Sequence, residues 1–308
     1  MISIVIPVWK TLYLARTIES VLAQTFTDFE LIVVEGRRLP EFDRIMSAYE
    51  DSRIQIHRHD PMPVVENWNQ CMGYAKGQFS ILLCDDDMFA PEHLEELFNL
   101  SLKYPKVDIF HSRVKIIDNE DGVVDISLMC AEYETAGDFI YQKMKYLRPQ
   151  FVSDFMYRTS KFWEIGGFVD RPMAWYSDVD TAIAMAIPNG IAFSEKATFL
   201  YRGADENISS NLKADQALEA VRQHYDSLLV SITLLAPKDS VYCDLIQSKA
   251  AKSRDKAYAG VYTRTGVGRY PFAPLFNAIR LRKRYPVTII RAILASVYAL
   301  GQQKNLKA

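Results

Sequence analysis

Over its first hundred residues, the chain alternates short β-rich runs with segments whose apolar residues recur at helical spacing. This alternation is typical of βαβ units, in which helices cover a mainly parallel sheet. We therefore predict an α/β fold. The predicted strands are Ser3–Val8, Glu30–Glu35, Arg53–Arg58 and Phe79–Cys84.

Three helices are predicted between and after these strands. Thr11 is placed to cap the first, Gly77 follows the second where a C-terminal cap belongs, and Pro91 suits the first position of the third. Each helix has one apolar face, which we expect to lie against the sheet. The predicted inward residues are Leu14, Ile18, Val21 and Leu22, then Val65, Trp68, Met72 and Ala75, then Leu94, Leu97, Phe98 and Leu102.

Beyond residue 105 the alternation is less regular. A hairpin turn is predicted at Asn119–Gly122, and Gly166 with Gly167 is expected to end a helix. From Asp215 onward the pattern is helical, with prolines dividing it into segments. The other predicted elements are strands Val107–His111, Val114–Ile117 and Ala197–Arg202, and helices Thr159–Ile165 and Ser177–Ile187.

The composition, 49% hydrophobic and 24% charged over 308 residues, is that of a folded globular protein. The four cysteines are scattered without paired spacing, so neither a disulfide framework nor a zinc site is predicted and a reducing, cytoplasmic setting is expected. The first strand follows Met1 directly, so we expect no secretory signal.

The formal net charge of −2 conceals a division along the chain. Residues 249–308 hold 13 basic side chains and one acidic one, whereas residues 1–248 hold 23 basic and 37 acidic ones. The tail also contains an apolar segment, Val287–Leu300. As a helix this segment would span about 21 Å, short of the roughly 30 Å hydrocarbon core, and it is not expected to cross a bilayer.

Three interpretations of this basic tail are open. Nucleic-acid binding has little support because no recognisable nucleic-acid module accompanies the charge. A helical bundle with solvated Lys and Arg is the plain alternative. The third is contact with an anionic membrane, with Arg280, Arg282, Lys283 and Arg284 on the lipid headgroups and nearby apolar residues in the headgroup boundary.

Three carboxylates, Asp85, Asp86 and Asp87, directly follow the predicted strand Phe79–Cys84. The carboxyl ends of strands are where open α/β sheets bind ligands. Adjacent carboxylates repel one another, and a divalent cation that leaves positions for substrate phosphate is the ordinary solution. The chain has no glycine-rich phosphate loop, which favours a metal over a solvated acidic turn.

Several characteristic segments follow one another along the chain, and the acidic turn Asp85–Asp87 is among them: Ile4–Val8, Ile18–Thr25, Phe29–Gly36, Asn67–Asn69, Leu82–Asp87 and Pro91–Leu94. Together they resemble the GT-A glycosyltransferases of family 2. The resemblance is strong over residues 1–105, looser over 150–211, and ends at about 215. It implies a GT-A-like fold, with a nucleotide-binding half over 1–105 and an acceptor-binding half over 106–211. Beyond these we expect a helical basic extension over 212–308.

The resemblance implies a nucleotide-sugar donor, with a UDP-sugar favoured, and a Mn²⁺ or Mg²⁺ ion at the acidic turn. Asp85 and Asp87 are expected on the metal, and Asp85 and Asp86 on the donor. Where the family usually has Asp-Asp-Gly-Ser, this chain has Val34–Arg37, which leaves the nucleotide base open. The other expected donor contacts are Pro7, Val8, Glu35, Asn69 and Arg202. From its position alone, Asn69 can equally be a polar residue on a helix surface.

A second acidic site, Asp178 and Asp180, opens the helix predicted from Ser177. As a capping arrangement, Ser177 would be the N-cap and both carboxylates would complement the helix dipole. The resemblance instead makes Asp178 the general base, with Asp180 as the fallback. We expect the helix N-terminus to lower the pKa of Asp178. Trp175 and Tyr176 offer flat faces for an acceptor sugar, or else pack in a core.

An inverting transfer needs one carboxylate to take the proton of the acceptor hydroxyl and a metal to stabilise the leaving diphosphate. The predicted function is such a transfer to a saccharide or lipid-linked saccharide in bacterial surface polysaccharide assembly, at the inner face of the membrane. One rival is a nucleotide-sugar pyrophosphorylase, which normally has a glycine-rich loop where this chain has Pro7–Thr11. The other is a non-catalytic scaffold that binds a nucleotide sugar or a membrane.

Overall fold

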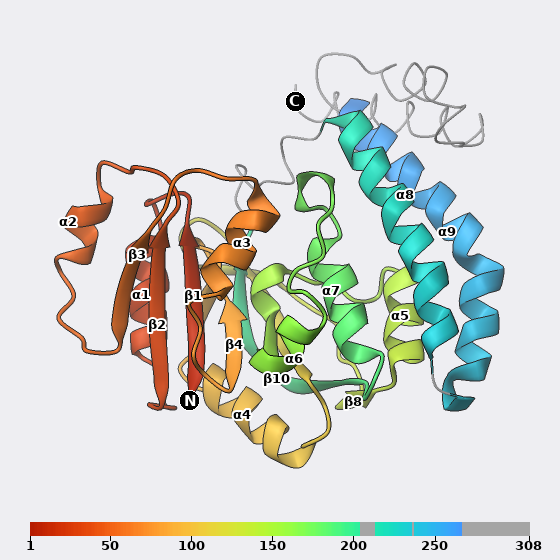
Figure 1. Ribbon diagram of the computed structural model, residues 1–308, viewed down its shortest axis with the longest axis horizontal. Coiled ribbons are helices and arrows are strands. Elements are labelled where there is room, and N and C mark those ends of the chain that lie inside the picture. The colour runs from red at the N-terminus through yellow and green to blue at the C-terminus, as the bar shows by residue number, and fades with distance from the viewer. Residues whose placement is uncertain (204–212, 236, 267–308) are drawn as a thin grey trace. The chain divides into compact units, whose positions relative to one another are not determined.

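The computed structural model describes residues 1–203, 213–235 and 237–266 (Figure 1). These residues form two compact units. The first comprises residues 1–170, 177–203, 235 and 237–239, and the second comprises residues 171–176, 213–234 and 240–266. The basic cluster from Arg280 to Arg284 and the apolar segment Val287–Leu300 lie outside the described residues.

The first unit is built on one mixed sheet, whose path is β3-β2-β1-β4-β9-β6-β10-β5 with β7 beside β6 and β8 beside β10. The strands β3, β2, β1 and β4 run parallel, as the sequence predicted, whereas β9 is antiparallel to both β4 and β6. Their bounds are β1 Ile2–Val8, β2 Phe29–Glu35, β3 Ile54–Arg58, β4 Phe79–Leu82, β5 Met88–Phe89, β6 Ile109–Ile117, β7 Val123–Ile126, β8 Tyr133–Glu134, β9 Phe155–Arg158 and β10 Ile191–Arg202.

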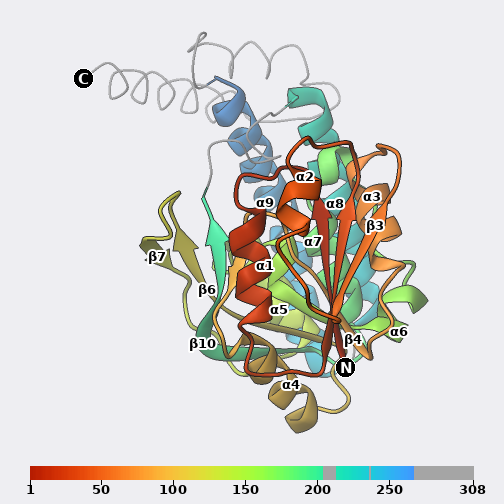
Figure 2. The same ribbon diagram turned by 90° about the vertical axis from the view of Figure 1, so that its left-hand side faces the viewer.

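Helices cover this sheet, and Figure 2 shows α1 and α3 on opposite sides of the parallel strands. The side chains of α1 and α4 pack into one hydrophobic cluster with alternate residues of β1, β2 and β4, whereas α3 contacts β1 and β4. The bounds in this unit are α1 Leu14–Leu22, α2 Phe42–Met46, α3 Val64–Met72, α4 His93–Lys103, α5 Ala136–Met144, α6 Thr159–Glu164 and α7 Ser177–Ala186, with 3₁₀ turns η1 Val152–Asp154 and η5 Pro237–Asp239.

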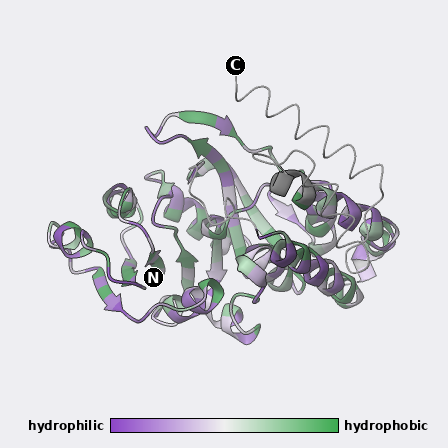
Figure 3. Ribbon diagram, turned by 90° about the horizontal axis from the view of Figure 1, so that it is seen from above, coloured by the Kyte–Doolittle hydropathy of each residue, from purple (hydrophilic) through white to green (hydrophobic). Residues whose placement is uncertain are grey.

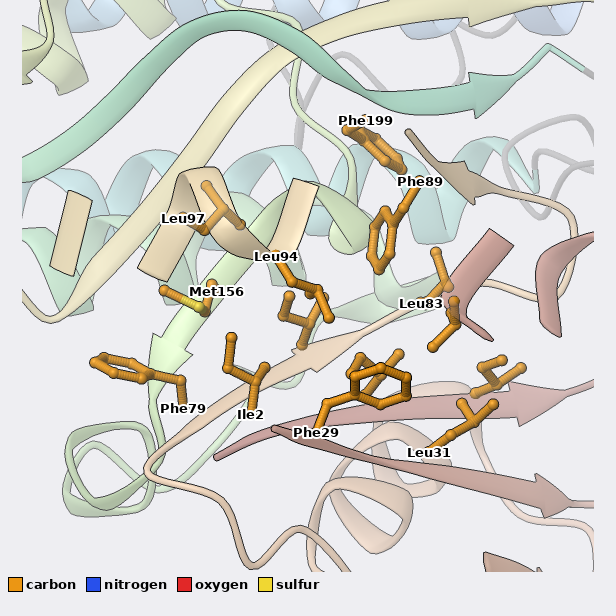
Figure 4. Close-up of a cluster of buried hydrophobic side chains, with 14 of the residues drawn as sticks. Ile2, Phe29, Leu31, Phe79, Leu83, Phe89, Leu94, Leu97, Met156 and Phe199 are labelled. Carbon is orange, nitrogen blue, oxygen red and sulfur yellow. The ribbon is translucent and has the colours of Figure 1, made fainter. Parts of the chain in front are cut away.

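The hydrophobic cluster draws on strands from both halves of the sheet. In the close-up of Figure 4, Ile2 of β1 and Phe29 of β2 lie in the same cluster as Met156 of β9 and Phe199 of β10. Figure 3 shows hydrophobic residues along the strands and mixed hydropathy along the helices. This buried cluster fixes the positions of β1 and β4. The carboxyl end of β1 leads into the loop at Trp9 and Lys10, and that of β4 leads into the acidic turn Asp85–Asp87.

The second unit consists of the 3₁₀ turn η2 Pro172–Ala174 and two long helices, α8 Ala214–Ser231 and α9 Ser240–Gly266, with η4 Ile232–Leu234 after α8. The two helices pack against each other, and the Tyr225 hydroxyl lies 2.6 Å from the Ser253 hydroxyl. The prediction of helix from Asp215 onward is therefore confirmed for the described part. None of the helices described by the structure is long and apolar enough to cross a membrane.

Several local predictions were wrong. Thr11 does not cap α1, whose N-cap is Tyr13 without a side-chain bond, and α3 ends at Met72 with Gly73, not Gly77, at its C-cap. Pro91 lies ahead of α4, and Leu102 is 64% exposed. The two strands predicted over 107–117 are one strand, β6, because pairing with β10 continues through residues 112 and 113.

Gly77 has a role other than the predicted cap. Its amide donates to the Ser3 hydroxyl at 2.8 Å, and that hydroxyl donates to the buried Glu30 carboxylate at 2.5 Å. A Cβ atom at Gly77 would lie 2.8 Å from both the Phe79 carbonyl oxygen and the Ser3 amide nitrogen. The backbone between α3 and β4 therefore approaches β1 too closely for any side chain.

We expect Gly77→Ala to lower the free energy of unfolding by about 2 kcal/mol or more, because backbone atoms must shift or the bond to Ser3 must break. Gly260→Ala is the matched control. Its added methyl would meet nothing within 4 Å on α9, and alanine favours a helix by about 0.5–1 kcal/mol. Urea denaturation followed by fluorescence measures both, and a Gly77→Ala loss below about 0.5 kcal/mol would contradict the packing described.

Candidate active site

The three carboxylates lie in the turn between β4 and β5, at the carboxyl end of the parallel strands. The Leu83 amide still donates to the Val5 carbonyl at 2.8 Å, so the turn begins directly beyond the sheet. The Asp87 amide then donates to the Cys84 carbonyl at 3.2 Å, which closes the turn. The predicted position of the acidic cluster at a strand end is confirmed.

Asp85 holds the loop that follows β1. Its Oδ2 atom accepts hydrogen bonds from the amides of Trp9 and Lys10, each at 2.6 Å. The carboxyl group is 7% exposed, and burial raises its pKa to about 7 although the two amides favour the charged form. Pro7 and Val8 precede these amides at the end of β1, so Asp85 fixes the path of the chain just after them.

Asp87 is the most deeply buried of the three, at 2% exposure. Its Oδ2 atom accepts from the Ser153 hydroxyl at 2.7 Å, and its Oδ1 atom accepts from the Arg202 amide at 3.0 Å. Burial, with the neighbouring Asp86 charge, raises the pKa of Asp87 well above its usual range. The ionised form of the Asp87 carboxyl group is therefore strongly disfavoured where no cation is bound.

Asp86 is partly exposed, and its pKa is raised by burial as well. One ligand atom each from Cys84, Asp86 and Asp87 lies within 4.8 Å of the others, the only group of this kind that the described residues contain. Burial also raises the pKa of the Cys84 thiol well above its usual range, and a thiol is a soft ligand that a hard cation does not favour. The remaining donors are carboxylate oxygens, which fit a hard cation such as Mg²⁺ or Mn²⁺.

The metal ligands predicted from the sequence were Asp85 and Asp87, and the structure groups a different pair of carboxylates. Asp87 belongs to it as predicted, but the structure brings Asp86 to it in place of Asp85. The reason is that Asp85 turns toward the loop after β1, where two amides occupy its Oδ2 atom. A sequence of three identical residues does not show which of them points away from the other two.

Arg202, at the end of β10, is fully buried and joins four parts of the first unit. Its guanidinium donates to the Asp86 carbonyl at 2.9 Å, to the Asp118 carbonyl at 2.6 Å and to the Asp121 carboxylate at 2.5 Å. The group also lies 4.1 Å from the ring centroid of Tyr13. Each of the three guanidinium nitrogens therefore has a protein partner.

Asp178 lies in the first turn of α7 and is partly exposed, whereas Asp180 is 7% exposed. The expected lowering of the Asp178 pKa is wrong. Burial raises it, and the nearby charge of Lys143 and a backbone amide offset this only in part. Ser177 is not the expected cap either, since its buried hydroxyl has no hydrogen-bond partner.

The loop before α7 contains Trp175 and Tyr176, which belong to the second unit. The Tyr176 ring stacks on His224 of α8, with ring centroids 4.2 Å apart. Met173, Ala174 and Tyr176 all have positive φ angles, between 57° and 71°, which are unfavourable for residues other than glycine. Both aromatic rings are partly exposed, so the structure leaves part of each face available.

Comparison with known proteins identifies the family of this chain. The profile described as Glycosyl transferase family 2 matches residues 3–166, more than half of the chain. The chain belongs to glycosyl transferase family 2. The matched region includes β1, β2, β4 and the acidic turn, and it ends at Gly166, ahead of Asp178.

Two relatives of this family 2 chain share less than a third of their residues with it over the matched regions. Glycosyltransferase GlyG of Streptococcus pneumoniae is 22% identical over 167 residues, which cover 49% of this chain and 55% of GlyG. Protein CgeD of Bacillus subtilis is 28% identical over 120 residues, which cover 36% of this chain and 28% of CgeD. The chain thus spans about half the length of GlyG, and less of CgeD.

Solved structures show the same GT-A fold. Residues 1–349 of S. aureus TarS, in complex with UDP-GlcNAc, have a TM-score of 0.64 at 16% identity over 97% of this chain and 88% of that one. The mannosyltransferase PcManGT from Pyrobaculum calidifontis, in complex with GDP-Man and Mn²⁺, has a TM-score of 0.55 at 12% identity over 97% and 86%. At such identities the likeness is one of fold.

Two of the expected donor contacts in this family 2 chain have structural partners. Glu35, 4% exposed, accepts from the Leu39 amide at 2.7 Å and from the Arg58 side chain at 2.8 Å. Asn69 bonds both backbone groups of Phe168, accepting from its amide at 2.8 Å and donating to its carbonyl at 3.1 Å. Asn69 thereby ties α3 to the loop formed by residues 166–168, a role that neither predicted interpretation included.

Arg37 and Ser153 were not among the expected site residues of this family 2 chain, and both have contacts beside the expected ones. Arg37, where the family usually has serine, lies over the half-exposed Trp9 ring with 4.4 Å between its guanidinium carbon and the ring centroid. Ser153 of η1 bonds Asp87 and also accepts from the Cys84 amide at 3.0 Å. The unusual Arg37 was visible in the motif, but nothing local to residues 151–155 marks Ser153.

We expect Arg202→Met to lower the free energy of unfolding by about 3–5 kcal/mol. The substitution removes a buried cation, and the Asp121 carboxylate and the carbonyls of Asp86 and Asp118 each lose a hydrogen bond. Arg16→Met is the matched control. Arg16 bonds the same Asp121 carboxylate at 2.9 Å but is 47% exposed, so its loss should cost less than about 1 kcal/mol. Urea denaturation of both variants checks this, and equal losses would show that Arg202 does not organise the site.

Proposed function

We propose that this chain transfers a sugar, with inversion, from a nucleotide-sugar donor to a saccharide or lipid-linked saccharide acceptor, assisted by a divalent metal. The observation that carries the proposal is the pair Asp86 and Asp87 at the end of β4, beside a loop that Asp85 anchors after β1. Carboxylates at this edge of an open sheet are suited to a metal and a diphosphate. Family membership and the GT-A fold support the same conclusion.

The residues that would hold the donor lie around this turn. Asp86 and Asp87 offer oxygen ligands for Mn²⁺ or Mg²⁺, and the bound cation would stabilise the charge of the departing nucleoside diphosphate. Pro7 and Val8 end β1 next to the anchored loop. Together with Trp9 and Arg37, which stack on each other, they are proposed to contact the nucleoside. TarS with UDP-GlcNAc and PcManGT with GDP-Man support a nucleotide sugar but differ in the base.

Asp178 is proposed as the general base. It is partly exposed, as a group that meets an acceptor must be, whereas Asp180 is buried. Its raised pKa makes the carboxylate a stronger base for the acceptor hydroxyl, provided that it remains ionised at working pH. One base would be enough, because a bound cation would supply the charge stabilisation that otherwise requires a general acid at the leaving group.

The acceptor contacts and the membrane location of the protein are proposed from the sequence. Trp175 and Tyr176, each partly exposed, are proposed to contact the acceptor sugar. The basic tail is proposed to bind an anionic membrane surface at its cytoplasmic face, which would suit a lipid-linked acceptor.

We expect Mn²⁺ to tighten nucleotide-sugar binding by about tenfold or more, a gain of about 1.4 kcal/mol. Calorimetry with UDP-, GDP-, CMP- and dTDP-sugars, each with and without Mn²⁺, measures this. Asp86→Asn and Asp87→Asn should abolish the gain, and Asp125→Asn, an exposed residue of β7, should keep it. If no nucleotide sugar binds under either condition, the proposed function is wrong.

We expect Asp178→Asn to lower kcat by about 10²–10⁴-fold, because the acceptor hydroxyl loses its base, while donor affinity stays within about twofold. The measurement is nucleoside diphosphate release with the donor found by calorimetry and a set of oligosaccharide acceptors. Asp180→Asn is the matched variant in the same helical turn and should lose far less. Full activity of Asp178→Asn would refute the base assignment, and a wild-type protein that binds donor but never turns it over would favour the scaffold.

A further inference from the structure

The loop of residues 171–176, which precedes α7, has an unfavourable backbone conformation. Met173, Ala174 and Tyr176 have φ angles of 59°, 57° and 71°, and they are three of the five non-glycine residues with positive φ in the described chain. Each is strained, because the Cβ atom of an L-residue crowds its own backbone in the left-handed region. Such strain persists only where other contacts offset it, and it concentrates at functional sites.

Contacts inside the loop offset little of this strain. The Ala174 amide donates to the Arg171 carbonyl at 2.9 Å, and the Trp175 amide donates to the Pro172 carbonyl at 3.2 Å. None of the side chains from Pro172 to Ala174 is buried. The loop therefore has no hydrophobic core of its own, and another element has to hold it in this conformation.

Helix α8 holds the loop at both ends. The Nη2 atom of Arg171 donates to the Ser227 hydroxyl at 2.6 Å. At the other end, the Tyr176 ring stacks on His224 of α8, with ring centroids 4.2 Å apart and ring planes 11° apart. Residues three apart in a helix are neighbours on its surface, so both contacts come from the same side of α8.

The packing of α8 fixes the His224 ring in place. His224 is 4% exposed, and the neighbouring Tyr225 is 3% exposed. The Tyr225 hydroxyl lies 2.6 Å from the Ser253 hydroxyl of α9, and the two helices pack along each other (Figure 1). The loop is therefore supported by a part of the chain beyond residues 3–166, to which the family profile is confined.

We propose that α8 is part of the acceptor site, because His224 and Ser227 position the loop so that Trp175 meets the acceptor sugar. The inference rests on the proposed function, in which Trp175 and Tyr176 contact the acceptor. The partly exposed Trp175 ring stacks in turn on Tyr176, with centroids 5.9 Å apart and planes 25° apart. The buried His224 ring thus supports two further rings, and the outermost offers a flat face to a sugar.

His224 and Ser227 are positioning residues in this proposal. They act through Tyr176 and Arg171, which they contact, and the acceptor touches neither of them. Without these contacts the strained loop would relax to a more favourable backbone conformation, and the face of Trp175 would be misplaced.

Hydrogen–deuterium exchange of the peptide that contains the loop tests whether α8 holds it. The Ala174 and Trp175 amides report the loop conformation, because both are bonded within it. In His224→Ala we expect them to exchange about tenfold faster, since Tyr176 loses its ring partner. His224→Phe keeps a flat ring and should retain wild-type exchange. Val230→Ala, which shortens a 63% exposed side chain of α8, should retain it as well.

Acceptor kinetics test the role in transfer. In the release assay with Mn²⁺ and the set of oligosaccharide acceptors, His224→Ala should raise the KM for the acceptor about tenfold, with kcat within about threefold of wild type. His224→Phe should restore the wild-type KM. Ser227→Ala removes the other contact at a partly exposed position and should raise the same KM about threefold. Donor affinity by calorimetry, and release to water without an acceptor, should be unchanged in every variant.

Several results would overturn the inference. These are wild-type exchange of the loop in His224→Ala, a wild-type acceptor KM in both His224→Ala and Ser227→Ala, or an equal loss in His224→Ala and His224→Phe. An equal loss of release to water would also overturn it, because the damage would then include the donor site.

Failure of the proposed function gives a different result. In that case the wild-type protein binds no nucleotide sugar, or binds one and shows no release that any acceptor stimulates, and the inference fails with it. If acceptors stimulate wild-type release and the His224 and Ser227 variants respond to them as wild type does, only the role of α8 is wrong.

Discussion

Three adjacent carboxylates, held at the end of one buried strand, are the constraint on which the rest of the site depends. Charges in a poorly solvated environment repel strongly and need either partners or neutralisation. Each carboxylate is stabilised in a different way. Asp85 accepts hydrogen bonds from two loop amides, Asp87 accepts from a hydroxyl and an amide, and Asp86 is partly exposed to solvent. Burial raises the pKa of both Asp86 and Asp87, and a bound divalent cation would favour their ionised forms.

The partners of these carboxylates come from distant parts of the chain and thereby hold the first unit together around the turn. Arg202 approaches from β10 and fixes both the turn and the β6–β7 hairpin. Ser153 approaches from η1, and the adjacent Asp154 lies 3.4 Å from His111 Nδ1 of β6. This short turn therefore bonds the proposed metal site directly, so a change in η1 is expected to disturb that site.

Local patterns were enough to predict the parallel strands, the hairpin at Asn119–Gly122 and the place of the acidic turn, because each depends on residues close in sequence. Roles set by distant partners were not predictable. Asn69 meets Phe168 across 99 positions, and Arg202 meets Asp86 across 116. The pKa of Asp178 was predicted in the wrong direction for a related reason, since its burial arises from tertiary packing whereas the helix terminus is visible in the sequence.

Asp86 and Asp87 are proposed to hold a divalent cation that binds together with a nucleoside diphosphate. Electron paramagnetic resonance of Mn²⁺, titrated with wild-type protein in the presence of UDP or GDP, detects such binding. We predict one Mn²⁺ per chain in a protein-bound state, with a spectrum distinct from that of the Mn²⁺–nucleotide complex alone. If the protein leaves the spectrum of Mn²⁺ with either nucleotide unchanged, Asp86 and Asp87 do not form this metal site.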